Sequence, residues 1–232
     1  MEYILSCKNL TKNYFTKTAL KDVDLNIPKG KIVGLLGPNG SGKTTFMKIA
    51  AGILRQSSGE ITINGEIPGV NSKAIVSYLP DKTHLYKWMK INDAIELFKD
   101  FYEDFDENRA DELLKFMKLE RNMSVKELSK GMYEKLSLTL VLSRKAKLYI
   151  LDEPLGWVDP VAREQILDAI ISNCNEESSM IITTHLVRDI ERVFEDVAFL
   201  KDGQIALYGN AEELRMEKEK SIDELYRDIF GE

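Results

Sequence analysis

Residues 37–45 carry glycines, a lysine and hydroxyl groups at a spacing that is typical of phosphate binding. They read Gly-Pro-Asn-Gly-Ser-Gly-Lys-Thr-Thr, which matches the pattern G-x-x-x-x-G-K-[ST]. The glycines let the backbone fold tightly and present several N–H groups to one anion. Lys43 can reach the β- and γ-phosphates of a nucleotide, and the Thr44 hydroxyl can ligate Mg²⁺. The predicted nucleotide-binding residues are Asn39, Gly40, Ser41, Gly42, Lys43, Thr44 and Thr45.

Two adjacent carboxylates at the end of an apolar run add a second chemical feature. Residues 148–154 read Leu-Tyr-Ile-Leu-Asp-Glu-Pro. If residues 148–151 form a strand, Asp152 can serve a magnesium ion beside the phosphate loop. Glu153 then points in a different direction and is the candidate general base that polarises the attacking water. The alternative is an acidic pair that only caps a strand, which the presence of the phosphate loop disfavours.

The elements around the phosphate loop should position these groups. The apolar run 31–36 predicts a strand that leads into the loop, and the loop should open a helix near Lys43. The helix takes its apolar face from residues 46, 47, 49, 50 and 53. Further strands are expected at residues 3–9, 20–27, 60–65, 74–79, 148–151, 180–183, 197–200 and 205–208, and helices at residues 161–172 and 186–194. This alternation predicts an α/β fold with a largely parallel sheet covered by helices.

The pattern changes in the middle of the chain. Helical spacing of apolar residues predicts three helices at residues 93–103, 108–118 and 129–145, and their aromatic side chains are expected to pack. The chain is therefore predicted to be a single domain, residues 1–232. Residues 1–84 and 146–210 would form a catalytic core with a β subdomain, residues 85–145 a helical subdomain, and residues 211–232 a charged helical tail.

Composition excludes several other classes of protein. The 232 residues are 44% hydrophobic and 30% charged, as in a globular protein with a sizeable core. No stretch approaches the roughly 18 apolar residues of a membrane span, and the first residues do not resemble a signal peptide. The net charge of −6 argues against a general nucleic-acid surface. Cys7 and Cys174 are predicted to be buried thiols, with a structural disulfide as the alternative.

Along nearly its whole length the chain resembles the nucleotide-binding domain of ATP-binding cassette (ABC) transporters. The resemblance adds four features to the phosphate loop and the acidic pair, in the family's order. Tyr14 lies upstream of the loop, and residues 128–132, Leu-Ser-Lys-Gly-Met, occupy the place of the signature L-S-G-G-Q. Residues 156–160, Gly-Trp-Val-Asp-Pro, look like the D-loop, and His185 follows a strand as the switch histidine does.

This resemblance implies an ABC ATPase fold: a P-loop core with a mostly parallel sheet, an N-terminal antiparallel β subdomain and a helical insert. It also implies a head-to-tail dimer that encloses two Mg-ATP. Tyr14 would stack on adenine, and Ser129 and Gly131 would begin a helix whose N-terminus donates to the γ-phosphate bound by the other copy. His185 would contact the γ-phosphate near Glu153, and Asp159 would signal across the dimer. Taken alone, His185 would be read as a packed or surface histidine and Tyr14 as an aromatic residue at a strand end.

The sequence departs from the family pattern in two places. Asp81 stands where the family has a glutamine that faces the metal, and its side chain is one methylene shorter. We expect it to act near Mg²⁺, directly or through water. Lys130 and Met132 replace the glycine and glutamine of the signature. The variant Leu79-Pro80-Asp81 resembles ABC-2-type exporters of Gram-positive bacteria.

The resemblance implies a separate membrane subunit as partner. Residues 84–89, His-Leu-Tyr-Lys-Trp-Met, are unusually apolar for a loop, and Leu85, Tyr86, Trp88 and Met89 are the predicted docking residues. The alternative is a buried connection inside the domain. The expected function is ATP-driven export of a peptide, lipid or drug, from a position on the inner, cytoplasmic face of the membrane. The competing hypotheses are a soluble ABC-type ATPase acting on DNA or ribosomes and a low-turnover ATP-dependent switch.

Overall fold

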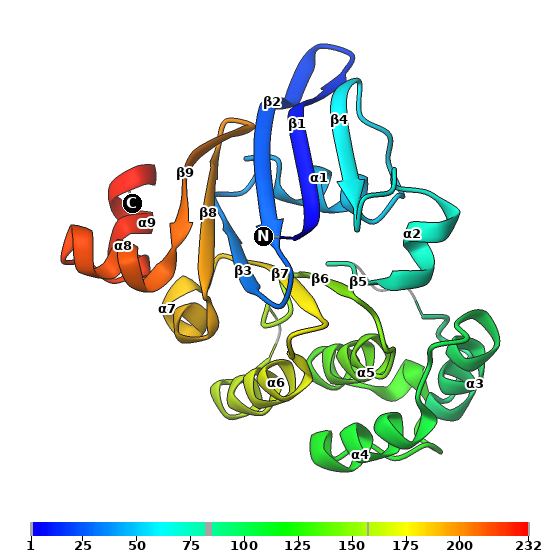
Figure 1. The fold of residues 1–232 in the computed structure, drawn as a ribbon. Helices are drawn as coiled ribbons and strands as arrows, with labels where there is room; N and C mark the ends of the chain where they lie inside the picture. Colours follow the sequence, from blue (N-terminus) through cyan, green and yellow to red (C-terminus); the bar gives the residue numbers. More distant parts are fainter. Residues whose placement is uncertain (1, 82–84, 157, 232) are drawn as a thin grey trace.

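Two β-sheets and the helices around them make up the fold seen in the computed structural model (Figure 1). The structure describes residues 2–81, 85–156 and 158–231. The strands are β1 (Tyr3–Tyr14), β2 (Lys17–Pro28), β3 (Ile32–Leu36), β4 (Ser58–Ile63), β5 (Val76–Leu79), β6 (Leu148–Asp152), β7 (Ser179–Thr184), β8 (Asp196–Lys201) and β9 (Gln204–Asn210). The α-helices are α1 (Lys43–Ala50), α2 (Val70–Ile75), α3 (Ile91–Phe101), α4 (Glu107–Met117), α5 (Lys130–Leu142), α6 (Pro160–Asn173), α7 (Val187–Ile190), α8 (Ala211–Lys218) and α9 (Ile222–Phe230). Two short 3₁₀ helices are η1 (Val125–Glu127) and η2 (Glu191–Val193).

The central sheet has six strands in the order β5-β6-β7-β3-β8-β9. Its strands are parallel except for β9, which runs antiparallel to β8. The register pairs Leu36 with Thr184 and Asp152 with Thr183, so the carboxyl ends of β3, β6 and β7 meet at one edge. Ligands of parallel sheets bind beyond this edge, and the residues predicted to do chemistry follow these strands.

Both faces of the central sheet are covered, which explains why its inner strands are apolar on both sides. On one face, Val33, Leu35, Leu148 and Ile150 join a core with α1 and the antiparallel sheet β2-β1-β4. On the other face, the alternate residues of the same strands, such as Leu151, join a core with α3 to α9. Helix α1 therefore lies between the two sheets, and the phosphate loop that opens it is fixed by packing on both sides.

A buried arginine, Arg144, joins the helical segment to the central sheet. The helical segment is the part of the chain that contains α3, α4 and α5. The Arg144 guanidinium donates to both carboxylate oxygens of Asp104, at 2.9 and 3.1 Å, in the turn between α3 and α4. It also donates to the carbonyl oxygens of Val76 at 2.6 Å and Ala74 at 2.8 Å, at the start of β5. The ring of Tyr102 lies 3.9 Å from the guanidinium carbon. One buried charge is thus satisfied by partners from the helical segment and from the edge of the central sheet at β5.

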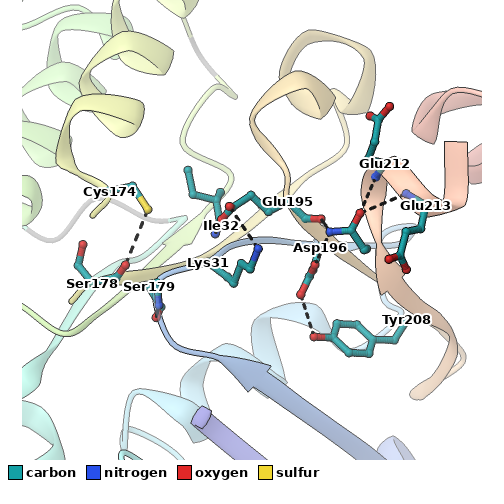
Figure 2. A network of polar contacts seen from close by, with 12 residues as sticks. Lys31, Ile32, Cys174, Ser178, Ser179, Glu195, Asp196, Tyr208, Glu212 and Glu213 are labelled. Carbon is teal, nitrogen blue, oxygen red and sulfur yellow. Dashed lines mark hydrogen bonds and ion pairs between the residues drawn. The ribbon is translucent and has the colours of Figure 1, made fainter. Parts of the chain in front are cut away.

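The amino ends of the strands are closed by a polar network (Figure 2). Asp196, at the start of β8, is buried, and its two oxygens accept from the Asn210 side-chain amide and the Tyr208 hydroxyl, each at 3.2 Å. The Asn210 side chain also caps α8 by accepting from the N–H groups of Glu212 and Glu213. This network fixes the C-terminal helices on the central sheet.

The predicted elements are found, with three corrections. Ile53 was placed on the apolar face of α1, but the helix ends at Ala50 and the Ile53 side chain is exposed. The helix predicted at residues 186–194 is the short α7 followed by η2, and α2 was not predicted. Both cysteines are free thiols, Cys7 buried and Cys174 half-buried. The division into a core, a helical subdomain and a tail stays a prediction.

Candidate functional site

The phosphate loop connects β3 to α1 and is shaped by glycines that no other residue could replace without strain. Gly42 has φ +113°, and a Cβ built there would lie 2.5 Å from the Ala19 carbonyl oxygen. A Cβ on Gly37 would lie 2.3 Å from the carbonyl oxygen of Leu200. The loop is therefore held tightly against β2 and β8, and it leads directly into the amino end of α1, which favours an anion.

Lys43 is the buried cation of the site. Its side chain lies along the loop, and Nζ donates to the carbonyl oxygens of Gly37 at 2.6 Å and Pro38 at 3.1 Å. Burial lowers the pKa of Lys43, and the nearby carboxylates of Glu153 and Asp152 oppose that shift. The ammonium group is thus held beneath the loop, where a phosphate could take the place of the carbonyl partners.

Asp152, at the end of β6, has an incomplete set of partners. It is 2% exposed, and its Oδ1 accepts from the Thr183 hydroxyl at 2.7 Å. Oδ2 is buried without a hydrogen-bond partner among the described residues. Burial raises the pKa of Asp152, while the hydroxyls of Thr183 and Thr44 act in the opposite direction. An unpaired buried carboxylate oxygen beside a threonine hydroxyl has the chemistry of an Mg²⁺ site.

The donor set fits a magnesium ion that also contacts phosphate. Thr44 and Asp152 supply hard oxygen atoms, and Asp81 lies near enough to raise the pKa of Asp152. Within the described part of the chain, no group of three or more His, Cys, Asp or Glu side chains is arranged to hold a metal alone. Magnesium commonly takes one or two carboxylates together with substrate phosphates, so the nucleotide itself would complete the site.

Glu153 and His185 form a directly bonded pair. Glu153 has φ +55°, an uncommon conformation for a residue other than glycine, and its N–H donates to the Thr183 hydroxyl at 3.1 Å. This kink turns Glu153 away from the strand direction of Asp152. The Glu153 carboxylate lies 2.8 Å from His185 Nδ1 and accepts from the His185 N–H at 3.2 Å. The imidazole therefore orients the carboxylate that was predicted to be the general base.

These residues share one cleft of about 650 Å³ at the carboxyl ends of the strands. The cleft is lined by Tyr14, Lys17, Ala19, Asn39, Gly40, Gly42, Lys43, Thr44, Thr45, Asp81, Asp152, Glu153, Gly156 and His185. Ser41 is instead buried within the loop, its hydroxyl unpaired among the described residues. Lys17 and Ala19 were missed because only the pairing of Tyr14 with Lys17 across the β1–β2 hairpin reveals their position.

The ring of Tyr14 is half-exposed and lies at the edge of the cleft. The Lys12 ammonium lies 5.2 Å from the ring centroid, a distance typical of a cation–π contact. The same ammonium donates to the carbonyl oxygen of Arg55 at 2.7 Å, so Lys12 is itself anchored. The structure thus places a supported aromatic ring at the cleft, and its stacking on adenine stays a prediction.

Besides Ser41, three predicted site residues lie outside this cleft. Ser129 caps α5 and accepts from the Met132 N–H at 3.2 Å, and Gly131 lies in the first turn of that helix. Asp159 caps α6 and accepts from the Ala162 N–H at 3.0 Å. They are not among the described residues that line the cleft, so a single copy of the chain does not bring them to its own nucleotide site.

The predicted docking segment is only partly exposed. Leu85 and Met89 are buried, because both belong to the core beneath α3, and their prediction as surface residues is wrong. Tyr86 and Trp88 are exposed, at 62% and 73%, with their rings stacked at 5.8 Å. Tyr133 accepts from the Leu85 N–H at 2.9 Å, which fixes the turn that presents them. Of the predicted motif residues, His84 and Trp157 lie outside the described residues.

Comparison with known proteins identifies the family. A family profile described as ABC transporter matches residues 20–156, and the chain belongs to that family. It is 33% identical over 219 residues to the ABC transporter ATP-binding protein YtrB of Bacillus subtilis, covering 92% of this chain and 74% of YtrB. It is 30% identical over 225 residues to the lantibiotic transport ATP-binding protein SrtF of Streptococcus pyogenes, covering 96% of each chain.

Solved structures agree with this identification. The chain is similar to an ATP-binding subunit of an ABC transporter, with a TM-score of 0.88, 26% identity and coverage of 97% of this chain and 98% of the other. A dimeric structure of the bacterial ABC transporter cassette MJ0796 gives a TM-score of 0.79 at 25% identity, covering 89% and 98%. The fold is the ABC ATPase fold, and the chain is an ATPase of this family. No helix in the described ranges combines the length and apolarity of a membrane span.

Proposed function

We propose that two copies of this chain pair around two Mg-ATP and power a separate membrane subunit that exports a substrate. The observation that carries the proposal is the cleft in which Lys43, Asp152 and the Glu153–His185 pair converge at the carboxyl ends of β3, β6 and β7. A buried lysine, an unpaired carboxylate oxygen and an oriented second carboxylate are the groups that hydrolysis of a nucleoside triphosphate needs.

The main polar and aromatic residues of the cleft each have a defined task in this proposal. The loop N–H groups and Lys43 bind the phosphates, and Tyr14 stacks on the base. Thr44 and Asp152, with Asp81, would hold a magnesium ion, which would neutralise charge on the phosphates. Glu153 accepts a proton from the attacking water, and His185 keeps its carboxylate oriented.

The position of Ser129, Gly131 and Asp159 supports a dimer. Ser129 and Asp159 cap helices, and none of the three lines the cleft of its own chain. The start of α5 carries the positive end of the helix dipole, which would complete the γ-phosphate site of the other copy. MJ0796, a cassette of similar fold, is described as a dimer.

An exposed surface beside the cleft supports a membrane partner. Tyr86 and Trp88 are stacked and solvent-exposed, as expected of residues that anchor a partner. A groove of about 310 Å³ runs between the sheet and α3, lined in part by Ile53, Tyr78 and Phe98. SrtF is named for lantibiotic transport, and the similarity to it favours export of a peptide. The proposed location is the cytoplasmic side of the membrane, through the permease.

The first test is capture of the membrane partner. A tagged Glu153→Gln variant, purified with Mg-ATP from detergent-solubilised native membranes, should bring down a stoichiometric multi-span protein detected by mass spectrometry. The Lys43→Ala variant is the matched control, because it should not close around nucleotide. Recovery of only ribosomes or DNA-bound complexes would overturn the transporter proposal in favour of a soluble ATPase. Hydrolysis by the parent chain that stays negligible with the captured membrane protein present would favour a low-turnover switch.

A further inference from the structure

Arg163, in the first turns of α6, contacts two segments. One carries Asp159, which is predicted to signal across the dimer, and the other carries His185, which is predicted to contact the γ-phosphate. The Arg163 NH1 donates to the carboxylate of Asp189 in α7, with which it forms an ion pair. Its Nε donates to the carbonyl oxygen of Val158 at 3.3 Å. Val158 directly precedes Asp159, and Asp189 lies four residues after His185. One guanidinium therefore joins the loop that carries Asp159 to the segment that carries His185.

The segment after His185 combines local hydrogen bonds with burial of Val187 and Ile190 in the core. The Thr184 hydroxyl accepts from the Leu186 N–H at 2.9 Å, and the Asp189 N–H donates to the Leu186 carbonyl oxygen at 3.1 Å. Helix α7 has four residues, too short to be stable without tertiary contacts. The Arg163–Asp189 pair supplies such a contact close to His185, whose ring lies 2.8 Å from Glu153.

A neighbouring ion pair shows why the contacts of Arg163 differ from an ordinary surface bridge. Arg192 pairs with Glu164 and also links α6 to the segment after α7, but both side chains are more than half exposed and neither touches the Asp159 loop. Arg163 is half-buried, and its planar guanidinium reaches two partners at once. A lysine in its place could keep one of these contacts but not the fixed geometry of both.

We propose that Arg163 is a positioning residue that couples the Asp159 loop to the His185 segment. The proposal rests on the proposed roles of His185 and Asp159. In a dimer, a change at the Asp159 loop would be transmitted through Arg163 and Asp189 to the orientation of His185, and so to the Glu153 carboxylate. Arg163 is not among the described residues that line the cleft, and it acts through these residues.

Steady-state hydrolysis of purified variants tests the coupling. Arg163→Met should lower kcat roughly ten- to a hundredfold, because displacement of a reacting group by about 1 Å has effects of this size. The KM for ATP and the Tm should change little. Asp189→Asn should lower kcat in the same way. The kcat of the double variant should be no lower than that of Arg163→Met alone, because both substitutions remove the same Arg163–Asp189 contact. Arg163→Lys should fall between. Glu164→Gln, which removes the neighbouring ion pair, should keep the parent kcat.

Several results would overturn the inference. An unchanged kcat in Arg163→Met, or additive losses in the double variant, would show that the pair does not act as one unit. If Arg163→Met folds poorly, Asp189→Asn decides alone, because it retains the arginine packing; a parent kcat there overturns the proposal. The variant His185→Ala distinguishes failure of the proposed role of His185 from failure of the coupling through Arg163. If it keeps the parent kcat, the proposed function of His185 fails and the coupling falls with it; if it is inactive while Arg163→Met is normal, only the coupling fails.

Discussion

The two ends of the central sheet each contain a buried aspartate, and the two side chains differ in their partners. Asp196, at the amino end of β8, has both oxygens hydrogen-bonded, by Asn210 and Tyr208. Asp152, at the carboxyl end of β6, has one oxygen bonded to Thr183 and one without a partner among the described residues. Both residues are buried aspartates of the same sheet. The difference in their hydrogen-bond partners therefore reflects different functions of the two ends of the sheet.

The comparison separates structural from functional burial. A buried polar group without a partner destabilises a fold by about 1–3 kcal/mol, and such a group persists where a ligand supplies the partner. The amino end is complete without any ligand, and it anchors the C-terminal helices. The carboxyl end adds the positive φ of Glu153 to the unpaired oxygen, and strain of this kind gathers at functional sites.

The largest effect on hydrolysis is expected from a substitution of Glu153, at the carboxyl end of the sheet. Glu153→Gln removes the base but keeps a side chain of equal size that can still bond to His185. It should lower kcat by about 10²–10⁴-fold, the range for loss of a general base, while ATP binding is retained and a stable nucleotide-bound dimer accumulates. Single-turnover hydrolysis and gel filtration with Mg-ATP measure both. Turnover near the parent rate would mean that another group acts as base.

Lys43→Ala should give the next largest effect. The change removes a buried cation whose role is to bind phosphate, and a charge-assisted hydrogen bond is worth about 1.5–3 kcal/mol. We expect a roughly ten- to hundredfold increase in the Kd for ATP, measured by calorimetry with Glu153→Gln as the background. Lys48→Ala, an exposed lysine on the same helix, is the control and should bind as the parent does. An unchanged Kd in Lys43→Ala would contradict the assigned role.

At the amino end, Asp196→Ala should affect stability and not hydrolysis. It leaves the Tyr208 hydroxyl without its acceptor and removes one of the two bonds that the Asn210 amide donates, which should lower the free energy of unfolding by about 1–3 kcal/mol. Tyr208→Phe, which removes a single hydrogen bond, should cost less. Urea unfolding measures the loss, and kcat below the transition should stay at the parent value. A large loss of kcat without loss of stability would show that this end also takes part in catalysis.

Asp152→Asn should have the smallest effect, and its sign should be opposite to that of Asp196→Ala. Asp196→Ala should lower the free energy of unfolding, whereas Asp152→Asn should raise it. Without ligand it should raise the free energy of unfolding by about 1 kcal/mol, because it removes a desolvated charge. Burial raises the pKa of Asp152 above its ordinary value of 3.8, so the folded chain holds this proton more tightly than the unfolded chain. As pH rises from 3.8 through the folded pKa, the unfolded chain loses the proton first and stability of the parent decreases. The advantage of the variant should therefore grow with pH over that window in urea titrations.

Much of the site could be predicted because its signals are local. The phosphate loop and the acidic pair are contiguous in sequence, and each follows an apolar run that forms a strand. The order of motifs also placed His185, although its bond to Glu153 spans 32 residues. Such pairing depends on β6 and β7 being neighbours in the sheet, which a linear pattern does not show.

The errors arose where tertiary contacts override local pattern. Leu85 and Met89 lie in an apolar loop that looked like a surface for a partner, but α3 and the core cover them. Ile53 continues the spacing of α1 beyond the point where Gly52 turns the chain. The contacts of Arg163 have no sequence signature, because its partner Asp189 comes from another helix.

Arg144 sets the mechanics of any movement between the helical segment and the sheet. Its guanidinium is bonded to Asp104 on one side and to the carbonyl oxygens of Ala74 and Val76 on the other. A rigid-body rotation that keeps these bonds must have its pivot close to this side chain. Displacements are then smallest near Asp104 and increase with distance from it, so the far end of α4 would travel furthest. The helical segment would work as a lever with Arg144 as its fulcrum.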